Sequence, residues 1–263
     1  MFILKPFIWM FETENFWKRI VQLLAVQLLF YILASVFNYF IMLQDISFIL
    51  KMLCYVLMFF SLVVPWLIFQ GYFWRLTANV ISRDMDIQSN SIYSGKVKSV
   101  FTIHLPEFKP AEFLWRGFAS VIATIVMILP YAMLVYSTIF TESFSMPWNN
   151  IDSYHKLYSA SYNLLYLFFF AFMPALLWNY AKQNSVFAVW NIPKAVYIIE
   201  NYFFKYVGHT ILFVIFYLLN FFVLYQIYQL FGNIVYLVSG ILYLYSLHVY
   251  AYLLGTITPV AEG

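Results

Sequence analysis

The sequence predicts an all-α integral membrane protein. Of its 263 residues, 64% are hydrophobic and only 10% are charged, whereas ordinary soluble domains carry about 25% charged residues. At this composition a water-soluble protein has too little polar surface to cover its apolar residues, but a lipid bilayer solvates them. The hydrophobic residues also gather in long uncharged runs, which is typical of membrane-spanning helices.

Six runs are long enough to cross a bilayer, because a helix needs about 20 apolar residues to span the ~30 Å hydrocarbon core. None of them contains Asp, Glu, Lys or Arg. Strands of a membrane barrel would instead alternate over ~10 residues between frequent turns. We therefore expect six transmembrane helices at Ile20–Leu43, Met52–Phe73, Phe118–Phe140, Tyr158–Trp178, Tyr206–Leu230 and Ile234–Leu254.

Basic residues lie mainly on one side of this arrangement. Twelve of the 14 lysines and arginines fall in the N-terminal segment and in the connections 74–117 and 179–205, whereas only Lys51 and Lys156 fall on the other side. Because Lys and Arg accumulate in cytoplasmic loops, both termini are expected to face the cytoplasm. The predicted location is a bacterial-type cytoplasmic (inner) membrane or its equivalent.

The spans also recur in pairs. ENFWKRI at Glu14–Ile20, AEFLWRGF at Ala111–Phe118 and ENYFFKYVG at Glu200–Gly208 each place an acid, aromatic residues and then a base before an odd-numbered span. Recurrence at similar positions indicates an internal repeat. The sequence thus predicts one membrane domain, 1–263, built from three tandem helical hairpins at about 5–78, 107–182 and 193–257, with a cytoplasmic loop at 79–106.

The segments that enter the first two hairpins have the pattern of interfacial amphipathic helices. Pro110 suits the first helical position, and Glu112 and Arg116 are i,i+4 neighbours of favourable orientation. An amphipathic turn of this kind lies along the membrane surface with its apolar side down. We expect short helices at Phe7–Trp17 and Ala111–Phe118, with their rings buried and their charges in water.

Several motifs follow one another in a fixed order along most of the chain: KPFIWMFETENFWKRI (Lys5–Ile20), GYFWRLTANV (Gly71–Val80), LPEF (Leu105–Phe108), WRGF (Trp115–Phe118) and PALLWNYAKQNSVFAVW (Pro174–Trp190). Together they resemble the DUF4013 family of uncharacterised membrane proteins. The resemblance implies a polytopic bacterial or archaeal membrane protein, and it brings no catalytic residues. The chain departs from the family between Val80 and Leu105, where its spacer is longer than expected.

His248 is the most unusual side chain within the spans, because it lies near the middle of the sixth. Polar groups at that depth are expensive and often functional. A metal site would need further His, Cys or carboxylate ligands at the same depth, and the polar neighbours there are Asn220, Ser239 and Ser246. A haem ligand pair would need a second deep histidine, whereas His209 lies near the cytoplasmic end. The favoured interpretation is a neutral His248 that hydrogen-bonds another helix.

Glutamines provide a second polar feature. Gln22 and Gln27 in the first span and Gln70 in the second could line a polar path. Alternatively they join helices through hydrogen bonds, each worth about 1 kcal/mol. Joining is favoured, because transporters usually add a charge within the membrane and these spans have none.

The connection 74–117 concentrates charge, including Arg75, His104 and Glu107. His104 and Glu107 have the residue types needed for acid–base catalysis. However, no Ser or Cys nucleophile motif and no phosphate-binding glycine loop accompanies them. Nearby lysines are better suited to anionic lipid headgroups, at about 1 kcal/mol each.

These observations rank three classes of function. A non-catalytic accessory or scaffold subunit that binds other membrane proteins or lipids comes first, either in a hetero-complex or as a homo-oligomer. A small transporter or channel comes second, and a membrane enzyme at the cytoplasmic surface comes third. The sequence indicates no cofactor, no metal and no catalytic residue, and the net charge of +3 gives no indication of nucleic-acid binding. The weak candidates for functional polar contacts are His248, Arg75, His104, Glu107 and Gln70.

Overall fold

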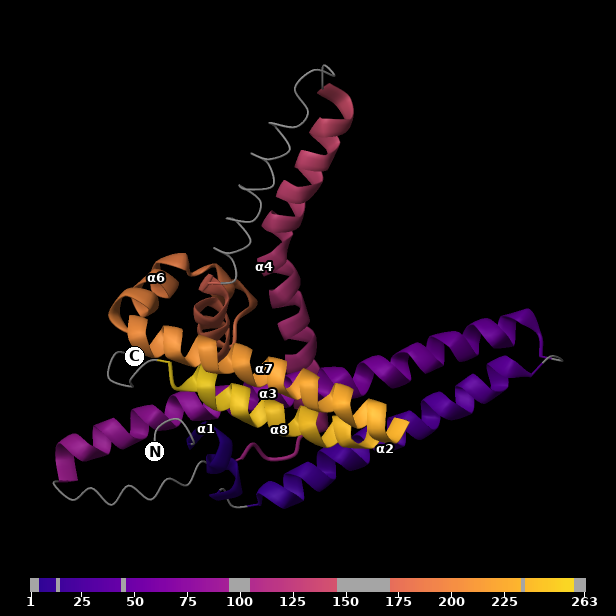
Figure 1. Cartoon of the computed structure of the whole chain (residues 1–263), viewed down its shortest axis with the longest axis horizontal. Coiled ribbons are helices and arrows are strands. Elements are labelled where there is room, and N and C mark those ends of the chain that lie inside the picture. The colour runs from indigo at the N-terminus through magenta and orange to yellow at the C-terminus, as the bar shows by residue number, and fades with distance from the viewer. Residues whose placement is uncertain are drawn as a thin grey trace. The chain divides into compact units, whose positions relative to one another are not determined.

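The computed structural model describes residues 5–12, 15–43, 46–94, 105–145, 171–232 and 235–257. Within these residues every regular element is a helix (Figure 1), which confirms the all-α class. Residues 171–183 are also helical. The named elements are α1 (Lys5–Ile8), η1 (Trp9–Glu12), α2 (Phe16–Met42), α3 (Phe48–Ser94), α4 (Pro110–Ser145), η2 (Val186–Trp190), α6 (Ile192–Asn201), α7 (Phe203–Phe231) and α8 (Val235–Gly255).

Five described helices are long and apolar enough to cross a membrane. They correspond to the predicted first, second, third, fifth and sixth spans. The predicted fourth span lies mostly in 146–170, outside the described residues, so the six spans and their arrangement as three tandem hairpins stay predictions. The apolar stretches are Phe16–Met42, Phe48–Ser82, Pro110–Leu129, Phe203–Phe231 and Val238–Gly255.

Helix α3 is much longer than the span expected from its apolar residues. Its 47 residues correspond to ~70 Å at 1.5 Å per residue, more than twice the hydrocarbon thickness. It therefore continues through 79–94, which the sequence assigned to the cytoplasmic loop. No Gly or Pro interrupts this stretch before Gly95, and those residues are the strongest helix breakers.

The chain divides into two compact units, the first made of Met1–Ser120 with Phe204–Gly263 and the second of Val121–Phe203. In the first unit α8 is the most enclosed helix. In the most apolar stretch of α8, 56% of the residues are buried, whereas in that of α7 only 6% are buried. Helix α3 packs against both α2 and α8, and α7 lies beside α8 (Figure 1). Leu23 of α2, Leu76 of α3 and Leu244 of α8 are fully buried in this core.

The two expected interfacial segments differ from each other. The N-terminal segment forms the short elements α1 and η1, and Asn15, with a left-handed φ of 65°, precedes α2. The aromatic rings of this segment are not all buried as expected, because Trp9 is buried whereas Trp17 is exposed. The prediction of a separate short helix at Ala111–Phe118 is wrong, since these residues form the first turns of α4. Pro110 does begin the helix as expected, and the helix continues through Gly117 into the span that follows.

Two glycines allow α3 and α4 to cross at very short distance. A Cβ atom on Gly71 would lie 1.7 Å from the carbonyl oxygen of Phe113, and one on Gly117 would lie 1.9 Å from that of Leu67. These neighbours are backbone atoms, so they cannot rotate away. Any side chain at Gly71 or Gly117 must push the two helices apart.

We expect Gly71→Ala and Gly117→Ala to destabilise the protein by about 1–3 kcal/mol, the usual effect of overpacking. Gly208→Ala is the matched control, because no heavy atom lies within 4 Å of its added Cβ and alanine favours helix. Thermal unfolding in detergent measures all three. Equal melting temperatures for Gly71→Ala and Gly208→Ala would contradict the close crossing.

Candidate functional site

Polar side chains of the first unit converge on α8. We call Tyr243, Ser246 and His248 of α8, together with Thr256 directly after its end, the α8 polar seam. Each member contacts a polar side chain of α3 or α7, so the seam joins three helices. The contacts are Gln70 Nε2 to Tyr243 Oη at 3.3 Å, Asn220 Nδ2 to Ser246 Oγ at 2.8 Å, Tyr72 Oη to His248 Nε2 at 3.0 Å and His209 Nε2 to Thr256 Oγ1 at 3.1 Å.

The Tyr72–His248 pair is the most deeply buried part of the seam, with neither residue exposed to solvent. His248 Nδ1 lies 2.7 Å from the carbonyl oxygen of Leu244. A carbonyl only accepts, so Nδ1 carries the proton and Nε2 of the neutral ring accepts from the Tyr72 hydroxyl. Both ring nitrogens are thus engaged. The hydrogen bond to another helix that the sequence favoured for His248 is present.

Aromatic rings surround this pair. Phe16 packs edge-on against the His248 ring with centroids 5.3 Å apart, and Trp9 lies 6.4 Å from it. Phe113 packs against Tyr72 at 5.6 Å. The rings come from η1, α2 and α4, so three further elements enclose one hydrogen bond. In such an apolar setting an unpaired polar atom is costly, and this makes the pair important for helix packing.

The three glutamines do not form one continuous line in the structure. Gln22 accepts from Arg19 at 2.8 Å near the start of α2. Gln27 lies against Gly240 of α8, and its buried Oε1 has no hydrogen-bond partner in the described chain. Gln70 contacts Tyr243. Of the three, only Gln70 therefore hydrogen-bonds a side chain of α8, as expected for a polar group that holds helices together.

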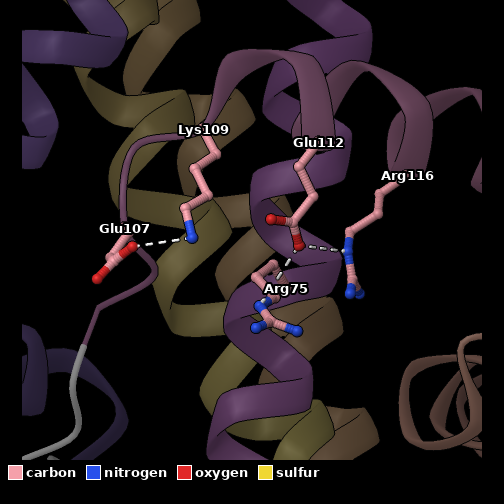
Figure 2. Close-up of polar contacts among 5 residues, drawn as sticks. All are labelled: Arg75, Glu107, Lys109, Glu112 and Arg116. Carbon is pink, nitrogen blue, oxygen red and sulfur yellow. Dashed lines mark hydrogen bonds and ion pairs between the residues drawn. The ribbon is translucent and has the colours of Figure 1, made fainter.

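The charged candidates form two separate groups beside α3 and α4 (Figure 2). Glu112 Oε1 lies 3.0 Å from Arg116 Nε and 3.8 Å from Arg75 Nε. The first contact is the i,i+4 pair that the sequence predicted, and the second joins α3 to α4. These side chains are partly exposed, so each pair contributes about 0–1 kcal/mol.

Glu107 pairs with Lys109 rather than with the arginines, at 2.9 Å. The hydrogen bond and charge of Lys109 lower the pKa of Glu107, and Glu107 in turn raises the pKa of Lys109. Both groups are well exposed, which leaves Glu107 an ordinary ionised surface carboxylate. His104 lies outside the described residues, so its position relative to Glu107 is not tested. Among the described residues no three His, Cys, Asp or Glu side chains gather as metal ligands would.

Comparisons with protein families, with curated proteins and with solved structures found no match. The resemblance to the DUF4013 family stays a prediction. The seam must therefore be interpreted from its own geometry, in which the polar groups face one another between helices.

Removing the Tyr72 hydroxyl should leave His248 Nε2 buried without a donor, which costs about 1–3 kcal/mol of stability. We expect Tyr72→Phe to lower the melting temperature in detergent, whereas Tyr39→Phe, with Tyr39 65% exposed, should not. His248→Leu should also destabilise. The double variant should be more stable than the sum of the two single effects predicts, because neither partner is then left unpaired. Strictly additive effects would mean that the hydrogen bond contributes nothing.

Proposed function

We propose that this protein is a non-catalytic accessory or scaffold subunit that acts by binding other membrane proteins or lipids. The polar contacts within its described spans support this proposal, because they join its own helices. Surface that a partner could cover lies elsewhere, chiefly on α7. Of the alternatives, a transporter would need a polar path, and an enzyme would need reactive groups open to substrate.

The observation that carries the proposal is an exposed aromatic stripe on α7. It consists of Tyr217, Phe221, Tyr225 and Tyr228, spaced by four, four and three residues. This spacing places their rings on one face of a helix. All four are more than half exposed, at 59%, 67%, 52% and 53%. We call them the α7 aromatic stripe.

The tyrosine hydroxyls favour a protein partner over lipid tails. Tyr217 lies 14 residues from either end of α7, near the centre of a span, whereas tyrosines that face lipid concentrate at the membrane surfaces. Its hydroxyl makes no hydrogen bond in the described chain. Hydrocarbon offers no hydrogen-bond acceptor, and leaving the hydroxyl unsatisfied there costs about 1–3 kcal/mol. A helix of another membrane protein with a polar acceptor would satisfy it.

The distribution of basic residues supports an orientation with both termini in the cytoplasm. Lys96 and Lys194 would then be cytoplasmic, and Asn149 would lie outside. An impermeant thiol reagent on intact cells should label a cysteine introduced at 149 and not one at 96.

Purification from native membranes in mild detergent tests the binding function. We expect wild-type protein to co-purify with another membrane protein, identified by mass spectrometry, and Tyr217→Ala/Phe221→Ala to lose it. The matched control is Leu28→Ala/Ile32→Ala, which removes similar exposed surface from α2 (60% and 51% exposed) and should retain the partner. Tyr217→Phe should weaken the complex about fivefold, since one hydrogen bond contributes about 1 kcal/mol.

Loss of the partner from both double variants alike would contradict a specific role for the stripe. His104→Ala and Glu107→Ala should leave the complex and its function intact. Loss of function in either one, with the complex still assembled, would favour the enzyme instead.

A further inference from the structure

In the second unit, two lysines approach the same indole ring. Lys182 Nζ lies 5.2 Å and Lys194 Nζ 5.9 Å from the ring centroid of Trp178. Trp178 and Lys182 belong to the helical residues 171–183, and Lys194 belongs to the first turn of α6. The face of an indole ring attracts ammonium groups, and here two of them share one ring.

Asparagines fix the two backbone segments relative to each other. Asn179 is fully buried, and its Nδ2 donates to the carbonyl oxygen of Asn191 at 3.2 Å. The Asn191 side chain in turn caps α6 by accepting from the backbone N–H of Lys194 at 3.1 Å. The start of α6, and with it Lys194, is therefore held against the helix that carries Trp178 and Lys182.

This arrangement gathers positive charge without a matching carboxylate. Neither ammonium forms an ion pair with an acid in the described part of the chain. Burial lowers the pKa of Lys182, and the charge of Lys194 lowers it further. Lys194 also lies in the first turn of α6, where the helix dipole disfavours a cation. An anion bound between the two lysines would offset the burial of Lys182, the repulsion between the two ammonium groups and the unfavourable interaction of Lys194 with the helix dipole.

A buried donor lies in the same cluster. Trp178 is only 3% exposed, and its Nε1 has no hydrogen-bond partner within the described residues. An indole N–H only donates, so its missing partner must be an acceptor. Two ammonium groups and one unpaired N–H donor together match a phosphate, which carries negative charge and several acceptor oxygens.

The surroundings indicate that this phosphate belongs to a lipid. Phe187, Trp190 and Ile192, which lie between the two lysines in the sequence, are 78%, 44% and 48% exposed. Apolar side chains that face outward beside lysines are typical of segments in the headgroup region of a membrane. A free phosphate would gain nothing from these residues, whereas a phospholipid would place its acyl chains against them.

We propose that Lys182, Lys194 and Trp178 form a binding site for the phosphate of an anionic phospholipid headgroup. The inference rests on the proposed function, whose lipid-binding part it specifies. The site belongs to the second unit and uses no residue of the α7 aromatic stripe.

Purified full-length protein in detergent, freed of lipid, tests the site by titration with phosphatidylglycerol and detection of bound lipid by native mass spectrometry. We expect Lys182→Gln/Lys194→Gln to weaken binding about 25-fold, since each lysine near an anionic headgroup contributes about fivefold. Lys182→Arg/Lys194→Arg keeps both charges and should restore most of the affinity. Lys18→Gln/Lys205→Gln removes two exposed charges elsewhere and should leave it unchanged.

Two further titrations separate the sources of phosphate. Phosphatidylcholine, which has no net charge, and inorganic phosphate should both bind much more weakly than phosphatidylglycerol. Inorganic phosphate binding as tightly as the lipid would overturn the lipid assignment. Equal phosphatidylglycerol affinity for wild type and Lys182→Gln/Lys194→Gln would overturn the site.

Co-purification of the membrane protein partner, measured on the same lysine variants, keeps the two proposals apart. It should be unaffected, because assembly depends on α7. A lysine variant that binds lipid normally disproves the site alone, whereas a wild-type protein without any partner disproves the accessory role alone.

Discussion

The hydrogen bond between Tyr72 and His248 sets the main constraint on the first unit. A bilayer offers no water to polar groups, so a polar group without a partner inside the protein is costly. The His248 ring is satisfied only if α3 brings Tyr72 to within 3.0 Å of it. That requirement fixes α3 against α8, and it needs Trp9, Phe16 and Phe113 to close the surrounding space. Helix α8 is consequently the most enclosed helix, although its sequence is not the most apolar.

The close crossing of α3 and α4 follows from the same constraint. Phe113 reaches Tyr72 only because Gly71 and Gly117 let the two backbones approach. The Arg75–Glu112 contact then joins the helices again nearer the surface. Helix α7 makes its polar contacts to α8 through Asn220 and His209 and leaves its aromatic stripe uncovered. The first unit thus combines an enclosed helix, α8, with an exposed one, α7.

Hydrophobic runs predict the five described spans well, because bilayer thickness sets the minimum length of an apolar run that can cross. The partner of His248 was predictable in kind but not in identity, since the chain has 23 tyrosines and only packing selects Tyr72. Helix continuity was harder to predict, as Ala111–Phe118 and 79–94 show. The stretch 79–94 is polar but contains no Gly or Pro that would end a helix, and α4 continues through Gly117 without a break. Lys182 and Lys194 fall in the basic connection 179–205, whereas their approach to Trp178 depends on the turn between two helices.

Water access to the Tyr72–His248 pair tests most directly whether the polar seam is structural. The proton on His248 Nδ1 can be followed by nitrogen NMR after transfer into D₂O, with His248→Gln used to assign the signal among the four histidines. A dry pair predicts a single neutral tautomer, protonated at Nδ1, with exchange far slower than at a partly exposed histidine such as His209. Rapid exchange at His248 would show that water reaches the seam, and a polar path through the protein would then replace a seam that only holds helices together.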